Sequence, residues 1–157
     1  MLSFHSNMKV VSLRISNPYG IGQDGAKGQG FISALIKSTF STAPLTIWGD
    51  GKAVRDFLHV KDVAVSFRRA IEYTGSHTVF NIGSSHGTSL NDLIVEFRRV
   101  SGIEIPVQYQ NGRTFDVRSN ILNTELAGIE LGWSPIVTLS AGIEGLVQHT
   151  QQRSLAA

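Results

Sequence analysis

The segment Met8-Lys9-Val10-Val11-Ser12-Leu13-Arg14-Ile15 constrains the fold of this chain more than any other. Its apolar residues are too continuous for a strand with one solvated face, so the pattern predicts a buried strand, most readily in a parallel sheet. A parallel strand needs a crossover connection before it, yet only seven residues precede Met8. We therefore expect that the chain is the last part of a longer fold.

Size and composition narrow the classes of protein. The 157 residues are enough for one domain-sized unit, and 41% hydrophobic with 17% charged residues indicate a globular chain. The net charge of +2 and the scattered Lys and Arg residues argue against nucleic-acid binding. No apolar stretch approaches the ~20 residues of a membrane span, and the first residues lack a signal-peptide pattern. We expect a cytoplasmic protein that contacts no membrane.

Strand-like and helix-like segments alternate along the rest of the sequence. This alternation predicts an α/β or α+β fold with mixed strand directions. Within it, Asp62 is expected to cap a helix whose apolar stripe includes Phe67 and Ile71. Ser89 and Asp92 predict a capping-box start to another helix. The expected order is a helix from Gly30, strands at 45–48 and 54–60, a helix at 62–75, a strand at 78–82, a helix at 89–102, a strand at 103–109, a short helix from Thr124 and a last helix at 139–151.

The stretch from Trp48 to Asp62 carries the most suggestive polar residues. Asp50-Gly51 predicts a tight turn that would join strands 45–48 and 54–60 into a hairpin. Arg55 and Asp56 stand inside the otherwise apolar return strand and need a partner or a water-filled cleft. The pair is either a solvated surface ion pair or an anion site in which the Arg55 fork holds phosphate oxygens.

Several kinds of site find little support in the sequence. There are no cysteines, and the five histidines show no pair at helical spacing, so no metal site is expected. No serine lies on a G-x-S-x-G elbow, and no paired carboxylates can be placed. The run Gly20-Ile21-Gly22-Gln23-Asp24-Gly25 matches G-x-G-x-x-G, but further glycines follow where a helix should begin. We therefore interpret it as a loop and not as a dinucleotide site.

Four polar residues remain at strand ends and in loops: Asn17, Arg55, Arg113 and Asp116. Two arginines and an asparagine that converge from different segments would suit a diphosphate, and Asp116 could accept hydrogen bonds from a ribose. Each also has an ordinary structural reading. Asn17 before Pro18 suits a turn, and Arg113 with Asp116 suits a surface pair. Spacing alone leaves these alternatives open.

Ordered motifs add a family resemblance over roughly residues 9–145. They are Arg14-Ile15-Ser16-Asn17-Pro18-Tyr19-Gly20, then Trp48-Gly49-Asp50-Gly51 through Arg55-Asp56-Phe57-Leu58-His59-Val60-Lys61-Asp62, then Phe80-Asn81-Ile82-Gly83, Arg113-Thr114-Phe115-Asp116 and Leu131-Gly132-Trp133-Ser134-Pro135. Together they resemble the extended short-chain dehydrogenase/reductases, the NAD-dependent nucleotide-sugar epimerases and dehydratases.

The resemblance implies roles for individual residues. Asn17 would contact the nucleotide-sugar diphosphate, and the Pro18-Tyr19 backbone would pass near the nicotinamide of the cofactor. Ile47 and Trp48 would flank the nucleotide base. The remaining implied roles are phosphate binding for Arg55 and Arg113, a position near the ribose for Asp116, strand pairing for Asp56, hydrogen bonding for His59 and helix capping for Asp62.

The sequence also lacks motifs that the family carries. It holds neither the glycine-rich cofactor loop nor a Tyr-x-x-x-Lys pair, because Tyr19, Tyr73 and Tyr109 are followed four residues on by Gln, His and Arg. The resemblance therefore assigns no catalytic residue here. It implies that NAD serves the parent enzyme and is not bound by this chain alone, which is expected to be inactive.

The fold prediction is an α/β C-terminal portion of a nucleotide-sugar epimerase/dehydratase, in one unit of residues 1–157. The last Rossmann strands would be residues 9–20 and 78–84. A small mixed α/β substrate-binding lobe would comprise residues 21–77 and 85–150, and residues 152–157 would fray.

The predicted function is nucleotide-sugar binding in an enzyme of the UDP-glucose/UDP-galactose 4-epimerase type. A 4,6-dehydratase, a decarboxylase and a non-catalytic nucleotide-sugar-binding module are the alternatives. Self-association is expected through a sheet edge that the missing part would cover.

Overall fold

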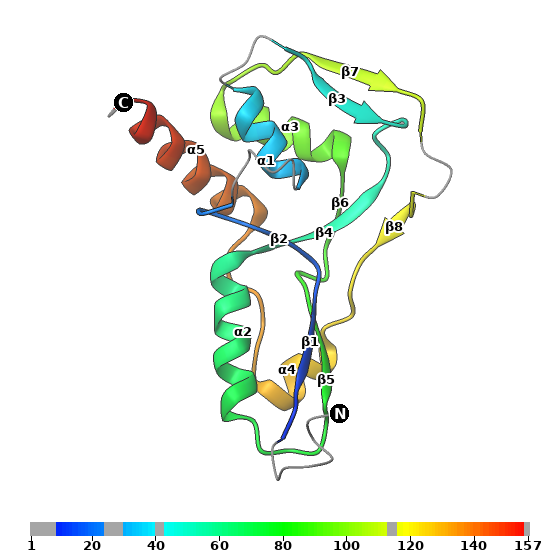
Figure 1. The fold of residues 1–157 in the computed structure, drawn as a ribbon, viewed down its shortest axis with the longest axis vertical. Helices are drawn as coiled ribbons and strands as arrows, with labels where there is room; N and C mark the ends of the chain where they lie inside the picture. The colour runs from blue at the N-terminus through cyan, green and yellow to red at the C-terminus, as the bar shows by residue number, and fades with distance from the viewer. Residues whose placement is uncertain (1–8, 24–29, 40–42, 113–115, 156–157) are drawn as a thin grey trace.

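The computed structural model describes residues 9–23, 30–39, 43–112 and 116–155. Arg113 therefore lies outside the described residues. Figure 1 shows helices and strands in alternation along the chain, as the sequence predicts. The helices are α1 (Phe31–Ser38), α2 (Val60–Glu72), α3 (Leu90–Ser101), α4 (Glu125–Leu131) and α5 (Leu139–Leu155), and the strands are β1 (Ser12–Ile15), β2 (Asn17–Tyr19), β3 (Leu45–Trp48), β4 (Val54–His59), β5 (Val79–Ile82), β6 (Gly87–Ser89), β7 (Val107–Gln110) and β8 (Ser119–Asn120).

The strands form small sheets in which parallel pairing dominates. β1 pairs with β5, and β3 pairs with β7, both in parallel. β4 is the central strand of the largest sheet, where it pairs in parallel with β2 and β8 and antiparallel with β6. These pairings confirm the prediction of an α/β fold with mixed strand directions.

The predicted hairpin between residues 45–48 and 54–60 is wrong. β3 pairs with β7 and β4 with three other strands, so the two strands belong to different sheets. The connection does turn sharply, because Gly49 and Gly51 both adopt positive φ angles. A turn sequence fixes the local backbone, but here the partners of each strand come from distant parts of the chain.

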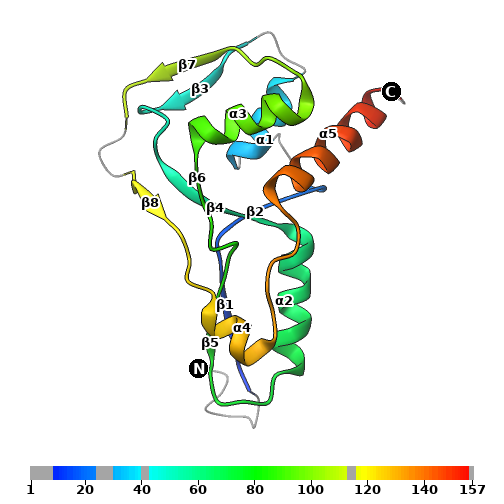
Figure 2. The same ribbon diagram turned by 180° about the vertical axis from the view of Figure 1, so that it is seen from behind.

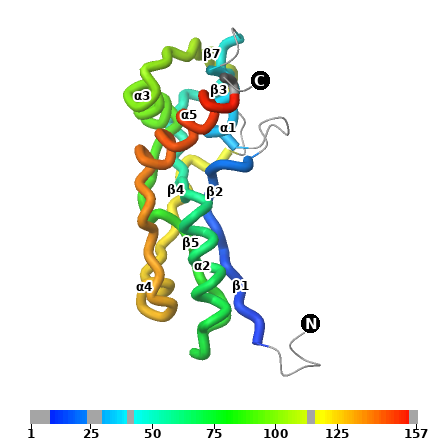
Figure 3. Tube along the Cα trace, turned by 90° about the vertical axis from the view of Figure 1, so that its left-hand side faces the viewer, coloured from blue at the N-terminus to red at the C-terminus, as the bar shows by residue number. Residues whose placement is uncertain are grey.

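Two hydrophobic cores lie at opposite ends of the molecule (Figures 1 and 2). At one end, α2 and α4 lie beside β1 and β5. This core contains Leu58, Phe80, Ile82 and Trp133, all almost fully buried. The sequence-based division assigned α2 and α4 to the substrate lobe, whereas the structure packs them against the two strands assigned to the Rossmann sheet. Figure 3 shows α4 and β1 at opposite sides of this end.

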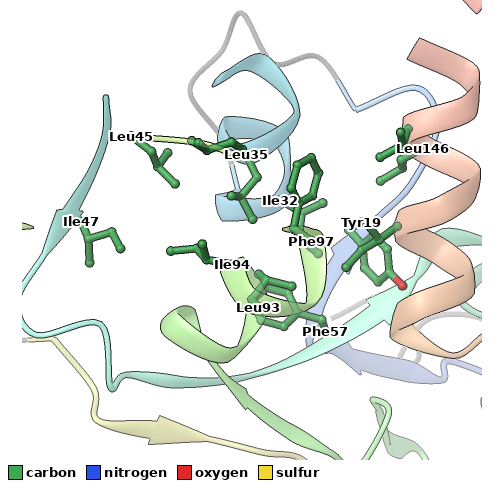
Figure 4. Close-up of a cluster of buried hydrophobic side chains, with 13 residues drawn as sticks. Tyr19, Ile32, Leu35, Leu45, Ile47, Phe57, Leu93, Ile94, Phe97 and Leu146 are labelled. Atoms are coloured by element: carbon green, nitrogen blue, oxygen red, sulfur yellow. The ribbon is translucent and has the colours of Figure 1, made fainter. Parts of the chain in front are cut away.

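The second core joins α1, α3 and α5 to the strands β2, β3 and β4. Figure 4 shows its side chains converging from these helices and from β3 and β4. Leu35 and Phe97 are completely buried within it. The core members include Tyr19, Ile32, Leu35, Leu45, Ile47, Phe57, Leu93, Ile94, Phe97 and Leu146.

The predicted helix ends are confirmed for α3 and wrong for α2. Ser89 caps α3 by accepting a hydrogen bond from the Asp92 amide at 3.1 Å, and Gly102 ends the helix in the left-handed region. In α2, His59 is the N-cap, since its Nδ1 accepts from the Lys61 amide at 3.3 Å. Asp62 instead lies in the first turn, and its Oδ2 accepts from the Val137 amide at 3.0 Å.

The predicted apolar stripe of α2 does not all face inward. Val63 and Ser66 are buried, whereas Phe67 is half-exposed and Ile71 is 85% exposed. α2 buries the side that packs against α4 and β4, and the sequence pattern of α2 does not predict which side that is. α5 is longer than predicted, because its helix continues through Leu155 into part of the segment expected to fray.

Candidate functional site

Four of the predicted site residues line one pocket of about 250 Å³: Asn17, Pro18, Tyr19 and Arg55. They come together because β2 and β4 are parallel neighbours, with Asn17 opposite Phe57. The wall is completed by residues from the loop before α1, from α1 itself, from β4 and from the start of α3: Gln23, Gly30, Phe31, Ile32, Phe57 and Leu90. The pocket is therefore polar at Asn17 and Arg55 and largely apolar elsewhere.

Asn17 is held in place by the neighbouring strand. Its Nδ2 donates to the backbone oxygen of Asp56 at 3.0 Å. This bond orients the side-chain amide at the pocket wall, where Asn17 is half-buried. The amide can therefore serve an anionic ligand from a fixed position.

Arg55 is also fixed by backbone oxygens. Its Nη1 donates to the Val54 oxygen at 2.9 Å and to the Val117 oxygen at 2.7 Å. These two bonds use both hydrogens of Nη1, so an anion would bind through the hydrogens of Nε and Nη2. A guanidinium that is already anchored loses less side-chain freedom when it binds phosphate oxygens.

Tyr19 contributes its backbone, while its ring belongs to the core. The side chain is almost fully buried, and its hydroxyl donates to the Leu139 oxygen at 3.5 Å. Burial, with a smaller contribution from Asp62, raises the pKa of the Tyr19 hydroxyl above its usual range. The hydroxyl therefore stays protonated at neutral pH, and it is not placed to act as a base.

His59 adjoins this ring from the end of β4. Its imidazole packs edge-on against Tyr19 with 5.3 Å between the ring centroids. Burial lowers the pKa of His59, although Asp62 opposes the shift. A neutral imidazole suits its role as N-cap, because Nδ1 must be unprotonated to accept the Lys61 amide hydrogen.

The other predicted site residues that the structure describes, Ile47, Trp48 and Asp116, lie away from this pocket. Ile47 is 1% exposed and belongs to the hydrophobic core, whereas Trp48 is 49% exposed. Successive side chains of β3 face opposite sides, so the two residues do not flank one ligand from the same face. Asp116 is exposed just before β8, beyond the pocket lining.

Sequence reasoning missed two parts of the site. Phe31 and Leu90 begin α1 and α3, and no sequence signal predicts that these helix starts meet at one pocket. The other part is the Asp56 carboxylate, which is completely buried and accepts hydrogen bonds from the Ser84 and Leu122 amides. A charge within an apolar strand was the available signal, but its partners lie 28 and 66 residues further along the chain.

Among the described residues, no group of three or more His, Asp or Glu side chains could hold a metal ion. Within the same residues, no helix combines the length and apolar character needed to cross a membrane.

Comparison with known proteins places these observations in a family. Residues 3–83 match the model of the NAD dependent epimerase/dehydratase family. A dTDP-4-dehydro-6-deoxyglucose reductase of Escherichia coli is 34% identical over 142 residues, which is 90% of this chain and 45% of that protein.

Solved structures of nucleotide-sugar-binding proteins have the same fold as this chain. A UDP-glucose 4-epimerase of Thermotoga maritima, solved with UDP-glucose, superimposes with a TM-score of 0.88 at 33% identity over 98% of this chain. MoeE5, solved with UDP-glucuronic acid and NAD, gives a TM-score of 0.85 at 30% identity over 95% of this chain. The chain spans about half the length of these proteins, 50% of the first and 49% of the second.

Proposed function

We propose a specific role for this chain, which belongs to the NAD-dependent epimerase/dehydratase family: it forms the nucleotide-sugar-binding portion of a UDP-sugar 4-epimerase. The observation that carries the proposal is the pocket shared by Asn17 and Arg55, whose polar groups are pre-oriented by backbone bonds. In this role the diphosphate would bind between the Asn17 amide and the Nε and Nη2 hydrogens of Arg55.

Three observations support the proposal: the positive charge of Arg55, the geometry of the pocket donors, and the ligands of the solved relatives. A diphosphate needs several hydrogen-bond donors in fixed positions, and the pocket supplies them from two adjacent strands. The two solved relatives described above were obtained with UDP-sugars, UDP-glucose in one and UDP-glucuronic acid in the other. Arg113 and Asp116 would add phosphate and ribose contacts from the segment before β8, and Trp48 would contact the base.

A reductase acting on a dTDP-sugar is the second candidate. The Escherichia coli protein favours it, because its match extends over 90% of the chain. UDP and dTDP differ in the base and the ribose 2′-hydroxyl but share the diphosphate. Both candidates therefore require Arg55, and they differ in which nucleotide binds more tightly.

The test is calorimetric titration of the purified chain with UDP, UDP-glucose, dTDP-glucose and NAD. We expect UDP-glucose to bind more tightly than dTDP-glucose, and NAD not to bind. Arg55→Ala should weaken UDP binding about 10- to 100-fold, because it removes charge-assisted hydrogen bonds. Arg68→Ala is the matched control, since Arg68 is an exposed arginine of α2 outside the pocket.

Three results would contradict the proposal. They are an absence of UDP binding, equal loss in both arginine variants, and tighter binding of dTDP-glucose, which would favour the reductase. We further propose that the chain alone performs no NAD-dependent turnover, because its sequence contains no Tyr-x-x-x-Lys pair to act on the sugar. Measured epimerisation by the purified chain would overturn that statement.

A further inference from the structure

The carboxylate of Asp56 is a hub of hydrogen bonds beneath the candidate site. It is completely buried, and both of its oxygens accept backbone amide hydrogens. Oδ1 accepts from the Ser84 amide at 2.7 Å and from the Ser84 hydroxyl at 2.6 Å. Oδ2 accepts from the Ser85 amide at 3.3 Å and from the Leu122 amide at 3.2 Å. The Ser16 hydroxyl adds a bond to Oδ1 at 3.3 Å.

These bonds tie three separate segments to β4. Ser16 joins β1 to β2, Ser84 and Ser85 follow β5, and Leu122 follows β8. Ser85 has a φ of 59°, which is unusual for a residue with a side chain. Its hydroxyl donates to the Leu122 oxygen at 3.0 Å, so the backbone of Leu122 is held at its N–H by Asp56 and at its C=O by Ser85.

The segment that contains β8 is held at both ends by adjacent residues of β4. Arg55 donates from Nη1 to the Val117 oxygen at 2.7 Å, and Asp56 accepts from the Leu122 amide. Between them, the Val54 amide donates to the Arg118 oxygen at 2.8 Å. The orientation of the Arg55 guanidinium therefore depends on where residues 117–122 lie.

We propose that Asp56 is a positioning residue for the anion site. Its buried carboxylate fixes residues 117–122 against β4, and this segment in turn supplies the Val117 oxygen that orients Arg55 toward the pocket. This inference deepens the proposed function and rests on it, because the ligand it concerns is the diphosphate. In this proposal Asp56 touches no ligand, and its side chain acts on Arg55 through the Leu122 amide and the serine loop after β5.

The substitution Asp56→Asn distinguishes this role from simple space filling. The asparagine side chain has nearly the same size as the aspartate, but one of its two terminal atoms is an NH₂ group. Because backbone amides point at both carboxylate positions, that NH₂ group would face an N–H donor in either orientation. Ser16→Ala is the matched control, since it removes one long bond to Oδ1 and leaves the three amide bonds in place.

The experiment combines hydrogen exchange with UDP titration on the full chain. In Asp56→Asn, we expect amide protection at Ser84, Ser85 and Leu122 to fall about tenfold or more, and UDP affinity per folded molecule to fall by a similar factor. In Ser16→Ala, both quantities should stay within about twofold of the unmutated chain. Bound UDP should raise the protection of the Leu122 amide, because coupling between sites is reciprocal.

The outcomes separate the proposals. Unchanged protection of the three amides in Asp56→Asn would overturn the inference. Lost protection with unchanged UDP affinity would also overturn it, because Asp56 would then serve folding alone. If the unmutated chain binds no UDP, the proposed function fails on its own; protection of residue 122 in the asparagine variant then decides whether Asp56 positions the segment.

Discussion

Asp62→Ala should destabilise the fold more than its position near a helix start suggests. Asp62 is the third residue of α2 and is almost fully buried. Its Oδ2 accepts the Val137 amide at 3.0 Å, which ties the chain after α4 to the start of α2. The backbone oxygen of Asp62 accepts from Trp133 Nε1 at 3.0 Å, and the substitution leaves that bond in place.

The expected cost follows from two contributions. Loss of a hydrogen bond to a charged group, with the Val137 amide left partly buried and unpaired, costs about 1.5–3 kcal/mol. Loss of a carboxylate from the first helical turn costs about 0.3–1 kcal/mol. The free energy of unfolding should therefore fall by about 2–4 kcal/mol, and Asp62→Asn should recover roughly half, because its amide oxygen can still accept from Val137.

Asp92 provides a matched control because it is the third residue of α3 and is exposed. Asp92→Ala should cost only about 0.5–1 kcal/mol. Urea denaturation followed by circular dichroism measures all three variants, and a typical slope of about 2 kcal/mol per M places the midpoint shift of Asp62→Ala near ~1–2 M. Equal costs for the two alanine variants would refute the argument that the buried tie to Val137 stabilises this end of the molecule.

Three other predictions test separate parts of the structure. Burial lowers the pKa of His59 below its usual value of 6.5, so the neutral imidazole is favoured in the folded state. The free energy of unfolding should therefore rise with pH between the lowered folded pKa and about 6.5, and fall again as the pH drops through this window. His59→Asn keeps a helix cap that does not titrate, so its unfolding midpoints should lack this pH dependence. Ile47→Ala should cost about 2–5 kcal/mol of unfolding free energy, whereas Trp48→Ala should cost far less and weaken UDP binding; a larger stability loss at Trp48 would contradict this. The sequence predicts self-association at a sheet edge, and the structure adds Phe67 and Ile71 of α2 as a second exposed apolar surface. We expect Ile71→Lys to reduce association in sedimentation measurements, whereas an unchanged association state would show that α2 is not involved.

Features with local causes could be predicted from the sequence. Ser89 and Gly102 bound α3 as expected, because a cap depends on residues within one turn of the helix end. The family resemblance implied diphosphate contacts for Asn17 and Arg55; the structure places both side chains at one pocket, and their binding role stays a prediction. Spacing alone left an anion site and a surface ion pair as equal alternatives.

Features that depend on distant partners could not be predicted. The hairpin failed because β3 pairs with β7, which lies far along the chain. The prediction that the apolar stripe of α2 faces inward was wrong, because the helix turns the polar residues Asp62 and Ser66 inward instead. A buried carboxylate cannot be predicted from an apolar pattern. Asp62 is tolerated inside because the Val137 amide pairs with it, and that amide comes from another part of the fold.

The strand β4 explains how structural and binding roles coexist within two adjacent residues. Alternation along a strand turns Arg55 toward the pocket and Asp56 toward the interior. Both residues nevertheless hold the same segment, Arg55 at Val117 and Asp56 at Leu122. An anionic ligand would thus bind a guanidinium that is held by the Val117 oxygen, and the buried Asp56 carboxylate fixes the segment that carries this oxygen. The charged pair inside an apolar strand is therefore no surface ion pair: one charge faces the pocket, and the other organises the backbone that holds it there.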